Sequence, residues 1–162
     1  MASRACRDIR AAIAAGAAIN FVRVPLGLHC PGNAADVRAL CRENGIAVLS
    51  DEGTLHGLLD EAYVGVPCPS VLDGLSHAAA ALIARAGGWD ALQALLVQVK
   101  AVADKHAVAM RTVGLRWQID QGVVPTLVLA LNADNGADAS LFCADSFLDA
   151  KDMAVLSALG RA

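Results

Sequence analysis

The stretch GGWDALQALLVQVKAVADKHAVAMRTVGLRWQIDQGVVPTLVLAL, residues 87–131, decides the fold, because it predicts a helix, a turn, a second helix and a strand in succession. Apolar residues of the first helix recur at the i, i+3, i+4, i+7 spacing, which places them on one buried face. These residues are Leu92, Leu95, Leu96, Val99, Val102 and Ala103. Gly87 and Gly88 mark the start of this helix, and Lys105 and His106 lie where cations favour the negative end of its dipole.

The second helix has Met110, Val113 and Trp117 on one face and is expected to end at Gly122, which adopts the left-handed conformation readily. Residues 123–131 are almost wholly apolar, which is typical of a parallel strand covered on both faces. The segment therefore predicts an α/β protein.

Residues 99–124, VKAVADKHAVAMRTVGLRWQIDQGVV, resemble the C-terminal half of the aldo/keto reductases. GGWDALQALL before them, GTLHGLL at 53–59, AYVG at 62–65 and SFLDAKDMAVLSAL at 146–159 are similar to the same family. The resemblance implies a (β/α)8 barrel and the transfer of hydride between a nicotinamide cofactor and a carbonyl group.

The rest of the chain is consistent with part of such a barrel. Further helices are expected at 7–16, at 33–41 with Asn33 as N-cap, at 78–86, and after Asp149 as N-cap. Strands are expected at 18–24, 46–49 and 123–131. With 162 residues the chain is shorter than the roughly 200–250 residues of a complete barrel. We therefore predict a single domain over 1–162: a partial (β/α)8 barrel of three parallel strands with flanking helices, corresponding to the last strands of the barrel. Its open sheet edges favour homo- or hetero-oligomers.

The residues that the family uses for reduction are not expected in this chain. The family's catalytic tyrosine, lysine, aspartate and histidine belong to the first half of its barrel, upstream of the matched segments. Tyr63, the only tyrosine, matches a packing aromatic, and Lys100 and Lys105 belong to an outer helix. The resemblance therefore implies no catalytic residue here.

Part of the family's cofactor site matches. Asn20 corresponds to an asparagine after the sixth strand, but Phe21 replaces the glutamine that contacts the carboxamide. Asp51 or Glu52 replaces the aromatic residue that stacks on the nicotinamide, and a carboxylate offers no stacking surface.

A small-residue loop follows, in which Gly53, Thr54, Leu55 and Gly57 can approach a pyrophosphate through backbone N–H groups. Glycine in a loop is more often only a turn residue. Residues 126–150 contain four aspartates and neither lysine nor arginine, so a 2′-phosphate finds no cation there. The cofactor, NADP or NAD, is thus implied by the resemblance only.

Composition excludes several other classes. The net charge is −3 with no basic run, which argues against nucleic acid. The sequence contains no run of about 18 consecutive apolar residues, so no membrane span is predicted. The four histidines and five cysteines show no zinc-ligand spacing, so no metal is expected, and the odd cysteine number favours a reducing, cytoplasmic location.

The turn between the two helices departs from the family's Gly-Val-Ser. Ala107 tolerates the left-handed conformation less well than glycine, and Ala109 cannot cap a helix, at a cost of about 1 kcal/mol. Gly114 replaces a preferred alanine, which costs about 1 kcal/mol more. The first hypothesis is a truncated reductase that is inactive as this chain alone. The alternatives are a non-enzymatic interaction module and one half of a two-chain oxidoreductase.

Overall fold

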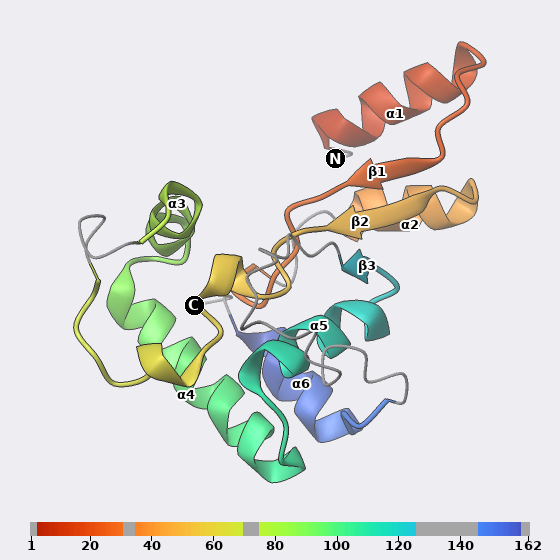
Figure 1. The fold of residues 1–162 in the computed structure, drawn as a ribbon. Helices are drawn as coiled ribbons and strands as arrows, with labels where there is room; N and C mark the ends of the chain where they lie inside the picture. Colours follow the sequence, from red (N-terminus) through yellow and green to blue (C-terminus); the bar gives the residue numbers. More distant parts are fainter. Residues whose placement is uncertain (1–2, 31–34, 70–74, 126–145, 160–162) are drawn as a thin grey trace, which may run out of the picture.

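The computed structural model describes residues 3–30, 35–69, 75–125 and 146–159. Its helices are α1 (Arg4–Ala14), α2 (Ala35–Glu43), α3 (His77–Arg85), α4 (Trp89–His106), α5 (Met110–Asp120) and α6 (Ala150–Ala158). Its strands are β1 (Phe21–Arg23), β2 (Ala47–Ser50) and β3 (Val124–Pro125), and two 3-10 turns follow β2, η1 (Leu55–Gly57) and η2 (Glu61–Tyr63). Figure 1 shows α1 and the sheet at one end of the molecule and α4, α5 and α6 at the other.

The sheet is small and parallel, with the strand order β1-β2-β3. Its strands are two to four residues long, and most described residues are helical. The prediction of a partial (β/α)8 barrel is therefore wrong. The apolar runs of the sequence predicted longer strands than the structure contains. The run at 18–24 yields only the three residues of β1, and residues 126–131 lie outside the described residues.

On one face of the sheet the side chains of the described residues are largely exposed. Side chains of paired residues in a parallel sheet point to the same side, and they alternate along each strand. The pairs Phe21–Ala47 and Leu49–Val124 therefore share one face, which we call the bare sheet face. Phe21 is 60% exposed and Val124 is 54% exposed. On the opposite face Val48 is buried in the core, and α2 contacts β2.

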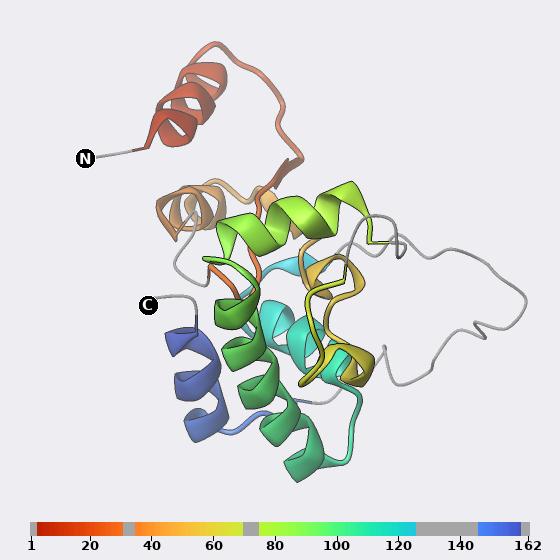
Figure 2. The same cartoon turned by 90° about the vertical axis from the view of Figure 1, so that its left-hand side faces the viewer.

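The helical end has a closed core. The six residues of the predicted stripe on α4 are all buried, as are Met110, Val113 and Trp117 of α5, so both helix predictions are confirmed. Figure 2 shows α6 alongside α4, and Leu156 of α6 is fully buried. The apolar stripes of α4 and α5 and Leu156 of α6 are therefore buried within the chain, while Val97 and Ile119 stay exposed.

The connection between α4 and α5 has the backbone that the sequence predicts. Ala107 adopts the left-handed conformation, with φ 53° and ψ 42°. Ala109 is the N-cap of α5 and offers no side-chain hydrogen bond. Gly122, with φ 72°, follows the end of α5. The expected cap of the N-terminal end of α2, Asn33, lies outside the described residues.

Gly114 is required by packing, and the interpretation that it weakens α5 is wrong. A Cβ there would overlap the Gly53 carbonyl oxygen and a methyl group of Leu59. Four residues further on, Gln118 donates from Nε2 to the Leu26 carbonyl oxygen at 2.5 Å. This face of α5 therefore lies against the loops that follow β1 and β2.

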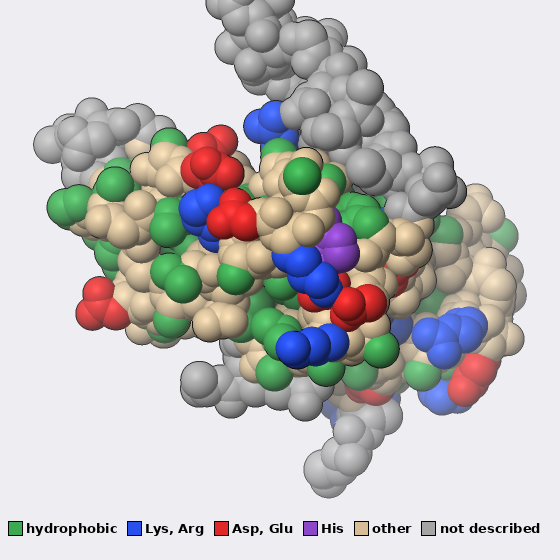
Figure 3. Space-filling model, turned by 90° about the horizontal axis from the view of Figure 1, so that it is seen from below, with side chains coloured by type: hydrophobic (Ala, Val, Ile, Leu, Met, Phe, Trp, Pro, Cys, Tyr) green, Lys and Arg blue, Asp and Glu red, His purple; other side chains and the backbone are tan. Residues whose placement is uncertain are grey.

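Charged groups attach α6 to the C-terminal end of α4. Asp149 is the N-cap of α6, as predicted, and its carboxylate accepts from Lys105 Nζ at 2.7 Å. Asp152 accepts from Lys105 at 2.8 Å and lies 2.7 Å from His106 Nε2. Hydrogen bonds, first from Lys105 and then from the Asp152 backbone, lower the pKa of Asp149 to about 2. Burial raises the pKa of Asp152, but hydrogen bonds from Lys105 and His106 outweigh it, so that pKa is lowered as well. Viewed from below, acidic and basic side chains lie next to one another on this surface (Figure 3).

Candidate functional site

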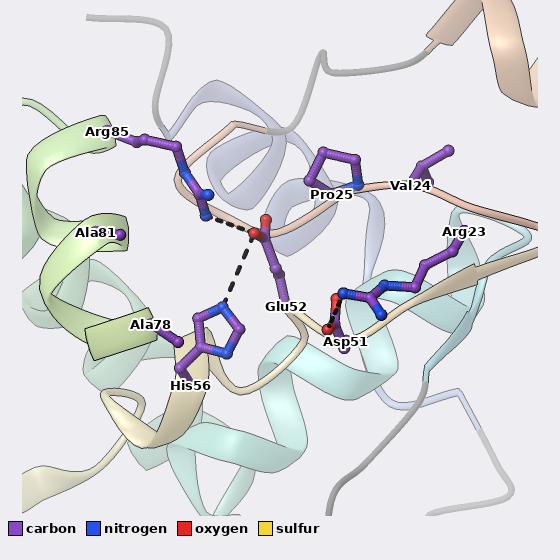
Figure 4. A pocket seen from close by; sticks show the side chains of 9 residues that line it. All are labelled: Arg23, Val24, Pro25, Asp51, Glu52, His56, Ala78, Ala81 and Arg85. Carbon is purple, nitrogen blue, oxygen red and sulfur yellow. Dashed lines mark hydrogen bonds and ion pairs between the residues drawn. The ribbon is translucent and has the colours of Figure 1, made fainter. Parts of the chain in front are cut away.

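A cavity of about 500 Å³ lies beyond the C-terminal ends of β1 and β2, under α3. Figure 4 shows its lining, in which charged side chains from both strand ends and from α3 point inward. The lining residues are Arg23, Val24, Pro25, Asp51, Glu52, His56, Ala78, Ala81 and Arg85. Parallel strands bring their carboxyl ends to the same edge, which explains why residues so far apart in sequence meet here.

Glu52 is the central group. Its side chain is 5% exposed, and its Oε1 accepts from Arg85 Nη2 at 2.5 Å. His56 Nε2 lies 3.9 Å from the same oxygen, and His29 Nε2 lies 3.5 Å from Oε2. A buried carboxylate is tolerated because Arg85 compensates its charge. The second carboxylate of the cavity, Asp51, pairs with Arg23 at 2.8 Å.

His29 lies behind the cavity, against Glu52. Burial, together with the nearby positive groups of Arg85 and His56, lowers the pKa of His29 to about 4, so its imidazole is neutral at neutral pH. His29 Nε2 lies 3.2 Å from Cys30 Sγ. His29 Nδ1 and Glu52 Oε2 are buried and have no hydrogen-bond partner among the described residues.

Gly27 makes this arrangement possible. A Cβ at this position would lie 2.9 Å from the Glu52 carbonyl oxygen and 2.9 Å from His29 Nδ1. Neither distance is tolerated by a real side chain, so only glycine lets the loop after β1 approach the loop after β2 closely.

The five residues predicted to bind a cofactor do not all lie together. Asn20 precedes β1, and its carbonyl accepts from the N–H of Ala47 at the start of β2, so it lies at the N-terminal edge of the sheet. The other four, Gly53, Thr54, Leu55 and Gly57, follow β2 at the opposite edge, in and beside η1.

Backbone N–H groups of that loop are already used within it. Leu55 N–H donates to the Glu52 carbonyl and Gly57 N–H donates to the Thr54 carbonyl, each at 3.1 Å. Gly53 lies against α5, where a Cβ would come within 2.5 Å of Gln118 Oε1. Binding of NADP or NAD by these residues stays a prediction.

The aromatic and cationic residues that were considered as catalysts have structural contacts elsewhere. Tyr63 packs edge to face on Trp89, with ring centroids 6.5 Å apart. Lys100 pairs with Asp104 at 2.8 Å on the surface of α4. None of the residues that line the cavity is a tyrosine or a lysine.

The sequence patterns did not place His29, His56 or Arg85 in a site. These residues follow no spacing rule, because they come from the loops after two strands and from α3. The available signal was their position directly after predicted parallel strands, where side chains converge.

The chain matches no family model. It is similar to flagellar radial spoke protein 5 of Chlamydomonas reinhardtii. The two are 37% identical over 175 aligned residues, which cover 93% of this chain. The chain spans one third, 33%, of the length of radial spoke protein 5.

This similarity overturns several expectations. The assignment to the aldo/keto reductases is wrong, because no family model matches and the similar protein is named as a component of flagellar radial spokes. The truncated reductase is accordingly wrong as the principal function, and so is the description as an oxidoreductase. The generic cytoplasmic location is wrong for the same reason. The helical hairpin did not identify a family, because amphipathic helices joined by a short turn occur in many folds.

None of the helices in the described ranges is both long and apolar enough to cross a membrane. The expectations of a single domain and of no nucleic-acid partner stay predictions.

Proposed function

We propose that this chain is a non-enzymatic interaction module that takes part in a multiprotein assembly of the radial-spoke kind. The observation that carries the proposal is the bare sheet face, on which Phe21 and Val124 are more than half exposed. Parallel sheets are normally covered on both faces, so an apolar face left open is a surface suited to a partner.

The surroundings of this face favour protein as the partner. Arg23 lies on the same face as Leu49 in the sheet register, and its ion pair with Asp51 leaves its side chain 69% exposed. Phenylalanine and arginine are among the residue types enriched at protein–protein interfaces. The partner that fits is another subunit of the assembly, bound through a surface that combines apolar and polar side chains.

The similarity to radial spoke protein 5 supports the kind of assembly. The aligned region covers 93% of this chain. The cavity favours no reaction, because each of its two carboxylates is paired with an arginine.

Binding to purified Chlamydomonas radial spokes tests the proposal. Labelled chain is mixed with the spokes and its co-sedimentation is titrated. Replacement of Phe21 by Glu is expected to weaken binding by about 30-fold, since a central contact is worth about 2 kcal/mol. Val97→Glu is the matched control, because Val97 is 51% exposed on α4, away from the sheet.

Three outcomes contradict the proposal: no binding of the unmodified chain, equal weakening by both substitutions, or reduction of an aldehyde with NADPH by the chain alone. Sedimentation of the chain without spokes distinguishes self-association, because a concentration-dependent dimer lost on Phe21→Glu would make a second copy the occupant.

A further inference from the structure

Three side chains with different donor atoms meet behind the cavity. His29 Nε2 lies 3.2 Å from Cys30 Sγ and 3.5 Å from Glu52 Oε2, and one ligand atom of each residue lies within 4.8 Å of the other two. An imidazole, a thiol and a carboxylate form a donor set that zinc binds and that calcium and magnesium do not.

The spacing of these atoms fits a tetrahedral ion. With Zn–N and Zn–O bonds of about 2.0–2.2 Å and a Zn–S bond of about 2.3 Å, neighbouring donors lie roughly 3.3–3.6 Å apart. Two of the three separations, 3.2 and 3.5 Å, come close to this range, and the third, between Cys30 Sγ and the Glu52 carboxylate, is within 4.8 Å. A small adjustment of the half-buried Cys30 side chain is enough to bring all three donors to one ion.

The two oxygens of Glu52 have different surroundings. Arg85 holds Oε1, and this bond orients the carboxylate from the cavity side. Oε2 points to the opposite side, toward His29, and has no hydrogen-bond partner among the described residues although the side chain is 5% exposed. A buried oxygen of a carboxylate without a donor needs an explanation, and a cation supplies one.

We propose that His29 Nε2, Cys30 Sγ and Glu52 Oε2 bind one Zn²⁺ ion. Binding forms one bond to each donor and releases the thiol proton of Cys30 to solvent. Arg85 stays on Oε1 as the group that orients the ligand, as outer partners of metal sites do. Three protein donors leave a fourth position for water. The ion would join the loops after β1 and β2 at the base of the cavity.

Metal analysis and cobalt spectroscopy of the 162-residue chain test this site. The chain is purified without chelator, its zinc content is measured, and the metal-free protein is titrated with Co²⁺. One zinc per chain is expected, and the cobalt form should show visible bands of tetrahedral Co²⁺ together with a thiolate-to-cobalt charge-transfer band.

Two cysteine variants localise the ion. Cys30→Ser should lose the charge-transfer band and stoichiometric zinc. Cys68→Ser is the matched control, because Cys68 is also a cysteine beside proline, is exposed, and belongs to no group of three possible ligands among the described residues. Circular dichroism of both variants establishes that they fold, and Glu52→Gln provides a second variant if Cys30→Ser does not.

Zinc should also raise the Tm of the unmodified chain and of Cys68→Ser but not that of Cys30→Ser. The proposal is overturned if the chain carries no zinc and Co²⁺ gives no thiolate band. It is equally overturned if Cys30→Ser and Glu52→Gln keep both, because the three side chains would then form only a buried polar cluster around the Glu52–Arg85 ion pair.

Discussion

The two ends of the molecule differ in which side chains they bury and which they expose. At the helical end, α4, α5 and α6 bury most of their apolar residues against one another, and the buried Asp152 is paired with Lys105 and His106. At the sheet end, Phe21 and Val124 are exposed while Glu52 and His29 are buried. The helical end therefore satisfies its buried charge and most of its apolar surface within the chain, whereas the sheet end carries an exposed apolar face and a buried Glu52–His29 group.

The largest expected effect compares an aromatic residue from each end. Trp117→Ala should lower the free energy of unfolding by about 3–5 kcal/mol, because the indole is fully buried and its removal leaves a cavity. Phe21→Ala should change it by less than about 0.5 kcal/mol, as for other exposed positions. Urea denaturation of both variants measures the difference. Similar losses would mean that the sheet face is not bare in solution.

A substitution at the contact between the two ends should lower the free energy of unfolding nearly as much. Gly114→Ala is expected to destabilise the chain by about 1–3 kcal/mol, because its Cβ would press on the Gly53 backbone. Helix propensity by itself predicts the opposite sign, a gain of about 1 kcal/mol. Denaturation midpoints decide between the two, and a stabilised variant would show that α5 is not packed against this loop.

The stability of the helical end should increase when the N-cap of α5 is improved. Ala109→Ser supplies the missing acceptor at the N-cap of α5 and should stabilise the chain by about 1 kcal/mol. Ala101→Ser, at an exposed position within α4, is the control and should bring no gain. Thermal unfolding followed by circular dichroism measures both, and equal shifts would refute the capping explanation.

The smallest effect concerns pH. Asp149 has a folded pKa of about 2, below its unfolded value of about 3.9, so the stability it contributes is present above the unfolded value and is lost as the pH falls through about 2. Lys105→Met should remove part of this dependence. Its urea midpoint should be lower than that of the unmodified chain at pH 6 and should fall less between pH 5 and 2. Parallel curves would show that the cluster at α6 contributes nothing, and added salt should shrink the difference.

The charge cluster at α6 also shows which features local sequence patterns predict and which they do not. Asp149 was recognisable as a cap because an aspartate preceded an apolar helical run, and the structure confirms it with a capping box. The partner that lowers its pKa most, Lys105, lies 44 positions away and becomes evident only when α6 packs on α4.

The sequence by itself determined the helices, the buried stripe on α4 and the end of α5 just before Gly122, because these depend on interactions between residues a few positions apart. Only the tertiary structure decided that the strands are short, that one sheet face stays bare, and that Gly114 is required. Only packing brought His29, Cys30, Glu52 and Arg85 together. Contacts between distant segments depend on how the loops after β1 and β2 approach one another, and no spacing along the chain records that approach.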